Sequence, residues 1–380
     1  MDLQELLSEI PMLLSLLVST ALALQPTPAE PPFDVEVVAD FEQPWAMAFL
    51  PDGGMLVTEK EGKLLIVATD GTVQHEVSGL PEVAYGGQGG MGDVTLHPDF
   101  ADNGMIYISY AEEGGRNRFG AVVGRGTLDL STGTLSEYEI IWSQAPKTSG
   151  RGHYGHRIVF SPDGEHLFIS SGERQKFNPA QNMSMNLGKI IRLYPDGSVP
   201  DDNPFVSEGG VTAQIWTSGM RNPLGMDFDA DGNLWEVEMG PAGGDEFQRI
   251  ERGENYGYPT VSNGDHYSGR DIPDHSDGDG FRAPDIWWTP VISPSSMDFY
   301  QGAAFPEWQG SALISGLSSR ALVRVTTDCA SSSTGACEAE RFDMGARIRS
   351  VVEGPQGNVW LLEDGGQRGE GRLLKLTPKN

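Results

Sequence analysis

The sequence predicts an all-β fold, a six-bladed β-propeller, on two observations. First, a turn rich in Gly and Pro followed by alternating apolar residues recurs about six times, roughly 45 to 75 residues apart. Second, few stretches longer than about ten residues keep a helical period without Gly or Pro. A propeller blade needs a repeat of about 40–50 residues with four strands, and long loops lengthen it. A β-sandwich, the alternative, would not require a repeated hairpin.

The repeated turns have a physical basis in their sequences. Pro fixes φ and Gly accepts positive φ, so Pro-Asp-Gly specifies a tight turn between two strands. The 49 Gly and 25 Pro residues are dispersed along the chain, which is typical of a folded, turn-rich protein. The copies occupy residues 50–57, 97–108, 161–169, 229–235, 306–314 and 354–360.

The N-terminus is expected to direct export. An apolar run over residues 11–24 ends in Ala21-Leu22-Ala23 and is too short to span a membrane, which takes about 20 apolar residues. It fits the apolar region and small-residue cleavage site of a signal peptide, although no Lys or Arg precedes it. We therefore expect a signal peptide at 1–24, a Pro-rich spacer at 25–33, and a propeller over 34–380. A periplasmic or secreted location, without stable membrane insertion, follows from this division.

The chain is acidic, with 54 Asp and Glu against 26 Lys and Arg and a net charge of −28. Such a field repels phosphate backbones, so a nucleic-acid partner is not expected. The only cysteines, Cys329 and Cys337, enclose seven small residues, Thr among them, and are expected to form a local disulfide in an oxidising compartment. Oligomeric state is not predicted.

Three clusters between residues 150 and 250 can carry chemistry. His153 lies on a Gly-flanked loop, and Glu173 would accept its imidazole N–H if both reach the central mouth of the propeller. Arg221 and Asn222 offer a guanidinium and an amide on a rigid turn, suited to an oxyanion or carboxylate. The segment 238–246 combines carboxylates with turn carbonyls, which are Ca²⁺ ligands. Each cluster also has a purely structural reading, as an ion pair, a turn cap or a solvated acidic surface.

The sequence resembles the soluble aldose dehydrogenases that depend on pyrroloquinoline quinone (PQQ), the glucose/sorbosone dehydrogenase family. The resemblance covers roughly residues 34–378 and rests on many short motifs in one order. These motifs lie at residues 43–49, 89–92, 97–100, 153–157, 171–174, 187–193, 219–223, 239–241 and 255–259.

The resemblance implies a six-bladed propeller that carries PQQ over its axis. His153 matches the family's catalytic base, Glu173 the carboxylate that orients it, and Gln88 a residue of the sugar pocket. Arg221 and Asn222 match cofactor contacts, and the match also implies a catalytic role for Arg221 near the quinone oxygen. The remaining matches are Arg347 and Arg349, which pair with PQQ carboxylates, and Gly240 and Pro241, whose carbonyls hold Ca²⁺.

The sequence also departs from the family pattern at the site. Ser318 stands where members commonly have a PQQ-contacting lysine, so that cation is either lost or supplied by Arg320. His156 stands where a glycine is usual and adds a second imidazole. Gly152 precedes His153 where some relatives carry an acidic sugar-binding residue.

The favoured function is oxidation of an aldose at C1 to its lactone, with PQQ and Ca²⁺ as cofactors and a separate, unidentified electron acceptor. Two alternatives remain open at this level. One is a non-catalytic sugar-binding or adhesion propeller that has lost the cofactor. The other is a Ca²⁺-dependent hydrolase of the lactonase type, which needs a metal held by carboxylate side chains in the central channel.

Overall fold

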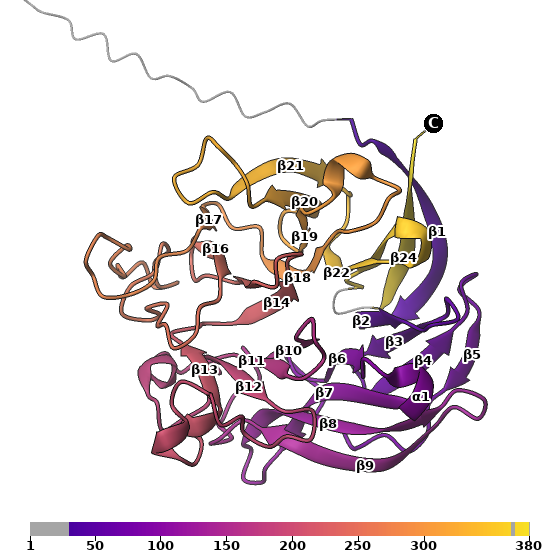
Figure 1. The fold of residues 1–380 in the computed structure, drawn as a ribbon, viewed down its shortest axis with the longest axis horizontal. Coiled ribbons are helices and arrows are strands. Elements are labelled where there is room, and N and C mark those ends of the chain that lie inside the picture. Colours follow the sequence, from indigo (N-terminus) through magenta and orange to yellow (C-terminus); the bar gives the residue numbers. More distant parts are fainter. Residues whose placement is uncertain (1–29, 366–368, 380) are drawn as a thin grey trace, which may run out of the picture.

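A computed structural model describes residues 30–365 and 369–379 and confirms the six-bladed β-propeller. Six four-stranded antiparallel sheets are arranged in a ring around a central axis (Figure 1). The expected signal peptide at 1–24 and spacer residues 25–29 lie outside the described residues. No helix in the described ranges is long and apolar enough to cross a membrane.

The first three blades follow one another along the chain, each beginning with its innermost strand. Blade 1 contains β2 (Pro44–Phe49), β3 (Met55–Glu59), β4 (Lys63–Val67) and β5 (Val73–Glu76). Blade 2 contains β6 (Met91–Leu96), β7 (Met105–Glu113), β8 (Phe119–Asp129) and β9 (Thr134–Ser143). Blade 3 contains β10 (Gly155–Phe160), β11 (Leu167–Ser171), β12 (Lys189–Leu193) and β13 (Ile215–Ser218).

The last three blades complete the ring. Blade 4 contains β14 (Pro223–Phe228), β15 (Leu234–Glu238), β16 (Asp245–Arg249) and β17 (Ile286–Trp288). Blade 5 contains β18 (Pro294–Phe299), β19 (Ala312–Gly316), β20 (Ala321–Thr326) and β21 (Cys337–Asp343). Blade 6 contains β22 (Ile348–Glu353), β23 (Val359–Glu363), β24 (Glu370–Pro378) and, outermost, β1 (Phe33–Glu42).

Within residues 30–365 and 369–379, each helix is about one turn long. The short helices are α1 (Phe100–Asn103), η1 (Asn178–Gln181), η2 (Val206–Glu208), η3 (Thr212–Gln214), η4 (Pro306–Trp308) and η5 (Pro355–Gly357). The six predicted turns all fall between the first and second strands of successive blades, as the repeat indicated. Gly53 and Gly164 hold φ at 91° and 74° in two of these turns, a conformation that favours glycine.

The ring is closed by its two ends. Strand β1 pairs antiparallel with β24 from Phe33 opposite Pro378 to Glu42 opposite Glu370. Phe33 is 2% exposed and packs edge-on against Trp308 and Phe342 of blade 5. The first strand of the chain therefore completes the last blade, and this pairing holds the two ends of the ring together.

Hydroxyl groups connect neighbouring blades near the axis. In four blades a Ser or Thr of the second strand donates to a carbonyl on the inner strand of the next blade. The pairs are Thr58 to Gly92 at 2.8 Å, Ser109 to His156 at 2.8 Å, Ser170 to Pro223 at 3.0 Å and Ser315 to Arg349 at 3.3 Å. These bonds fix the inner strands, whose ends carry the site, relative to one another.

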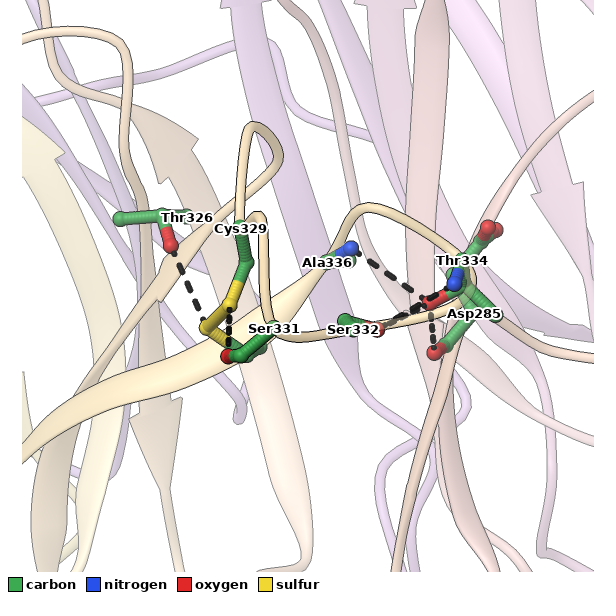
Figure 2. The surroundings of a disulfide bond; sticks show 8 residues. Asp285, Thr326, Cys329, Ser331, Ser332, Thr334 and Ala336 are labelled. Atoms are coloured by element: carbon green, nitrogen blue, oxygen red, sulfur yellow. Dashed lines mark hydrogen bonds between the residues drawn. A yellow bond between two sulfur atoms is a disulfide. The ribbon is translucent and has the colours of Figure 1, made fainter.

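The predicted disulfide is present between Cys329 and Cys337, with Cα atoms 5.9 Å apart (Figure 2). It closes the connection between β20 and β21 on the outer side of blade 5. Within that loop the Thr334 hydroxyl donates to the Asp285 carbonyl of the β16–β17 connection at 2.8 Å. The bridge therefore anchors a loop that joins blades 4 and 5 far out from the axis.

Carboxyl groups connect blades 4, 5 and 6. Asp227 accepts from the Phe299 amide at 2.6 Å, and Asp298 accepts from the Glu353 amide. Asp227 is also hydrogen-bonded to Asp298. Burial raises the pKa of Asp227 from 3.8 to about 6. Burial also raises the pKa of Asp298, and the charge of the neighbouring Asp227 raises it further. The two carboxyls therefore share a proton in the folded protein at mildly acidic pH.

We predict that Asp227→Asn makes stability less dependent on pH. A group whose pKa is raised by folding stabilises the folded state below its unfolded pKa, and this contribution is lost as pH rises through about 6. In wild type the free energy of unfolding should therefore fall more between pH 4 and pH 8, by on the order of 1 kcal/mol, than in the variant. Urea unfolding across this range measures the difference, with exposed Asp52→Asn as the control. Equal pH slopes for Asp227→Asn and wild type would contradict the shared proton.

Candidate active site

The main cavity lies where the inner strands converge and measures about 750 Å³. A volume of this size suits a ligand of drug-like or cofactor dimensions. Its walls come from several blades, so only the closed ring creates it. The lining includes Gln43, Trp45, Lys60, Tyr85, Gln88, Tyr154, His156, Asn222, Leu224, Met239, Ser293, Leu317, Arg347, Arg349 and Asp364.

The predicted His–Glu pair forms beside this cavity. His153 precedes β10, Glu173 follows β11, and His153 Nδ1 lies 2.5 Å from Glu173 Oε1. Gln88, a cavity residue, accepts the His153 backbone N–H through Oε1 at 2.6 Å. In the described part of the chain, His153 Nε2 makes no hydrogen bond, so this nitrogen remains available to a substrate.

Glu173 is fully buried and held by backbone amides. Its Oε1 accepts from Gln175 N at 2.9 Å, and its Oε2 accepts from Phe177 N at 2.6 Å and from Lys176 N. Burial by itself would raise the pKa of Glu173, but the His153 contact and these amides outweigh burial, so its pKa lies below the ordinary value. Glu173 is thus an ionised acceptor, and it fixes the imidazole with Nδ1 as the donor.

Burial also shapes the basicity of His153. It lowers the pKa of His153, against the opposing effect of Glu173, and the positive charge of Arg221 lowers it further. His153 is therefore neutral at neutral pH, which is the state that can accept a proton.

Arg221 and Asn222 are positioned by a buried glutamate of the neighbouring strand β15. Glu238 Oε2 accepts the backbone N–H groups of Arg221 and Asn222 at 2.6 and 2.8 Å. The Arg221 guanidinium donates to the Met239 carbonyl at 2.7 Å, and its Nε is enclosed with no acceptor in the described part of the chain. Asn222 lines the cavity and accepts from Gly155 N at 3.2 Å. Arg221 itself is 4% exposed and does not line the cavity, whereas Met239 and Asn222 do.

The predicted Ca²⁺ ligands form a buried turn beside the cavity. Neither the Gly240 nor the Pro241 carbonyl accepts a hydrogen bond from any described residue, whereas the Gly240 N–H donates to Asp245 Oδ1 at 2.9 Å. Neither residue lines the cavity itself, but the preceding residue, Met239, does. Burial raises the pKa of Asp245 to about 6, and burial with a neighbouring carboxyl raises that of Glu246. Two carbonyls without a hydrogen bond from the described residues, beside carboxyls whose pKa burial raises despite the charge of Arg221, fit a divalent cation.

The opposite wall of the cavity is cationic. Arg347 Nε and Arg349 Nη2 lie 2.9 and 3.1 Å from Asp364 Oδ2, and Lys60 donates to the Gly87 carbonyl at 3.2 Å. Arg349 Nε is enclosed and has no acceptor among the residues that the structure describes. Burial lowers the pKa of Lys60, and the positive charge of Arg349 lowers it further. This wall thus carries three cationic side chains, and Asp364 is the main carboxylate that offsets their charge. The excess of positive charge suits a ligand with several negative charges.

An ion pair occupies the channel beneath the cavity. Arg157 Nη1 lies 3.0 Å from Asp93 Oδ1, its Nη2 donates to the Ser295 carbonyl at 2.6 Å, and its guanidinium stacks 4.2 Å over Trp45. Asp93 also accepts the Ile158 N–H at 2.9 Å. A guanidinium therefore lies between the inner strands of blades 2, 3 and 5, whereas the hydrolase alternative needs carboxylates that are free to hold a metal there.

Sequence reasoning missed several cavity residues. Lys60, Tyr85 and Asp364 carry no motif. Lys60 and Asp364 reach the cavity because they directly follow strands of blades 1 and 6, and Tyr85 because it lies in the connection between β5 and β6. Arg320, considered as a substitute for a lost cation at Ser318, does not line the cavity, and Lys60 does. The Ser318 hydroxyl instead donates to the Val291 carbonyl at 3.2 Å.

Together, fold and site define a class: a six-bladed propeller with a buried His–Glu pair beside a cationic cavity at its axis. The family described as Glucose / Sorbosone dehydrogenase matches residues 41–375. The aldose sugar dehydrogenase YliI of Escherichia coli K12 is 38% identical over 355 residues, covering 91% of this chain and 93% of that protein. The chain therefore belongs to the glucose/sorbosone dehydrogenase family.

Solved structures agree with this assignment. The soluble aldose sugar dehydrogenase of E. coli in its apo form has a TM-score of 0.85 at 38% identity, covering 91% of this chain and all of that one. The PQQ-bound aldose sugar dehydrogenase of Streptomyces coelicolor has a TM-score of 0.73 at 26% identity, covering 92% of this chain and all of that one.

We predict that Glu173→Gln shifts the acidic limb of the pH–rate profile to lower pH. Glu173 raises the pKa of His153, so its removal lowers that pKa, and activity is lost only when pH falls through the new, lower value. The weaker base should also lower the plateau of kcat/KM by roughly 10²-fold. Profiles of kcat/KM from pH 4 to 8 measure both effects. A limb that stays in place or moves to higher pH would contradict the pairing.

Proposed function

We propose that this protein oxidises an aldose at C1 to the corresponding lactone, with PQQ as the resident cofactor, Ca²⁺ beside it, and a separate electron acceptor. The observation that carries the proposal is His153, neutral and fixed through Nδ1 by a buried carboxylate, with Nε2 available beside the cavity. Family membership and the PQQ-bound relative support the choice of cofactor.

The cavity residues fit PQQ on the chemistry of their donors. PQQ is flat and carries several carboxylates, and the cavity offers Lys60, Arg347 and Arg349 on one wall. The enclosed Nε atoms of Arg349 and Arg221 have no acceptor among the described residues, which suits an added anion. Arg347 and Arg349 would hold the carboxylates, while Arg221 and Asn222 would face the opposite side. When bound, PQQ would supply the acceptor for a hydride, which carries the two electrons of the oxidation.

The chain's own residues then perform the proton chemistry. Gln88 and His153 would bind the sugar, and His153 Nε2 would take the C1 hydroxyl proton as C1 loses its hydride, so that the carbonyl of the lactone forms. Glu173 remains ionised and stabilises the imidazolium that results. Arg221 stabilises negative charge that develops on the cofactor side. Gly240 and Pro241 would hold Ca²⁺ through their carbonyls, where the ion acts as a Lewis acid.

Residues 1–24 are proposed to be a signal peptide, and residues 34–380 the catalytic propeller. The disulfide between Cys329 and Cys337 supports an oxidising compartment, and we propose the periplasm or the exterior.

We predict that dye reduction by the purified protein requires an aldose, PQQ and Ca²⁺ together. Apoprotein reconstituted with PQQ and Ca²⁺ is assayed with a panel of aldoses and an artificial electron acceptor, with and without a chelator. The expected result is sugar-dependent dye reduction that the chelator abolishes and added Ca²⁺ restores, with the lactone identified as the product. Sugar binding without dye reduction would instead favour the non-catalytic propeller, and lactone hydrolysis without PQQ would favour the hydrolase.

A further inference from the structure

His156 occupies a backbone conformation that a side chain rarely adopts. Its φ is 94°, directly after Gly155 at 77°, and the pairing of β10 with β11 shifts register between Gly155 and Ile158. The Ser109 hydroxyl donates to the His156 carbonyl at 2.8 Å and helps hold this bulge in place. Positive φ is costly for a residue with a Cβ, and such strain persists mainly where a site requires the side chain. Bulges of this kind redirect side chains next to active sites.

The imidazole of His156 is packed firmly into the cavity wall. It is 3% exposed, and its ring centroid lies 5.8 Å from that of Trp45 and 5.2 Å from that of Tyr154. On the far side, a Cβ added at Gly92 would come within 2.9 Å of Nδ1, so the ring has no room to turn away. His156 nevertheless lines the cavity. Its orientation is therefore fixed toward the ligand space.

The two ring nitrogens of His156 have different surroundings. Nδ1 is enclosed and has no hydrogen-bond partner among the described residues. Nε2 is not among the enclosed, unpaired atoms. It is therefore the ring nitrogen that a ligand in the cavity can reach. Buried N–H groups without an acceptor are rarer than buried acceptors without a donor, so the proton belongs on Nε2. Burial, with Arg174, Arg157 and Lys60 nearby, lowers the pKa of His156 to about 3, so the ring is neutral.

A neutral donor has a particular value at this position. Lys60, Arg157 and Arg349 already place positive charge around the cavity, and a further cation would repel them. An imidazole Nε2–H adds a hydrogen bond to an anionic or carbonyl oxygen without adding charge. Trp45 and Tyr154 hold the ring in place, so little conformational freedom is lost when a ligand binds.

We propose that His156 is a cofactor-binding residue, which donates Nε2–H to an oxygen of PQQ from the wall of the cavity. This inference rests on the proposed function, because it names a contact to the same cofactor. It does not give His156 any part in proton transfer from the sugar, which belongs to His153.

The first test is PQQ affinity of the apoprotein, measured by fluorescence quenching. His156→Phe keeps a ring between Trp45 and Tyr154 and keeps the backbone strain, but it lacks the N–H donor. We expect its Kd for PQQ to rise at least about tenfold, in line with the loss of a hydrogen bond to a charged acceptor. His166→Phe, on the β10–β11 turn away from the cavity, is the matched control and should bind as wild type does. Thermal unfolding of each apoprotein shows whether the variants are folded.

The second test needs no substitution to fold, because it observes the wild-type imidazole directly. Long-range ¹H–¹⁵N spectra of the apoprotein should show one neutral histidine, protonated at Nε2, that does not titrate between pH 5 and 8. Its Nε2 resonance should shift when PQQ is added. An Nδ1–H tautomer, or a resonance unmoved by bound PQQ, would overturn the proposal.

The outcomes separate the two proposals. If wild-type protein binds PQQ and His156→Phe, shown to be folded, binds it equally well, only the role of His156 fails. If wild-type protein binds no PQQ at all, the proposed function and this inference fail together.

Discussion

The contact between Glu173 and His153 is the interaction on which the site depends. A carboxylate that is fully buried is stable as an anion only because backbone amides of residues 175–177 and the imidazole satisfy it. Those amides are available only because the chain turns sharply after β11, with positive φ at Arg174, Gln175 and Phe177. Strain in this turn is thus the local cost of holding one histidine in one tautomer and one orientation.

The second constraint is electrostatic. The protein as a whole carries a net charge of −28, yet its central cavity is lined by Lys60, Arg347 and Arg349, with Arg157 below. Asp364 and Asp93 offset part of this charge, and the remainder selects for an anionic ligand. The hydroxyl bonds between blades keep these cations at fixed positions, because each connects the inner strand of one blade to its neighbour. The contacts that stabilise the fold near the axis therefore also position the charges that determine which ligand the cavity prefers.

Much of this arrangement could be predicted from the sequence, and the reason is local chemistry. Pro-Asp-Gly turns specify hairpins wherever they occur, so their recurrence revealed the six blades. His153 and Glu173 could be paired because each lies at a strand end within one blade, 20 residues apart. Spacing of two cysteines across a short loop was likewise enough to predict the bridge between Cys329 and Cys337.

What could not be predicted depends on contacts between blades. Nothing local marks Lys60 as a cavity residue or Arg157 as the partner of Asp93, because the cavity and this ion pair are built from residues of different blades. The closing pair of β1 and β24 joins residues more than 300 positions apart, beyond the reach of any periodicity. The conformation of His156 was also invisible, since a sequence does not show that a position has positive φ when its residue is not glycine.

The most direct test of the central claim is a single-turnover measurement with His153→Gln. Protein loaded with PQQ is mixed with an aldose carrying hydrogen or deuterium at C1, and cofactor reduction is followed by absorbance. We expect wild type to reduce the cofactor with a deuterium isotope effect, and His153→Gln to bind PQQ normally but to reduce it roughly 10²- to 10⁴-fold more slowly. Reduction by the variant at the wild-type rate would contradict His153 as the base.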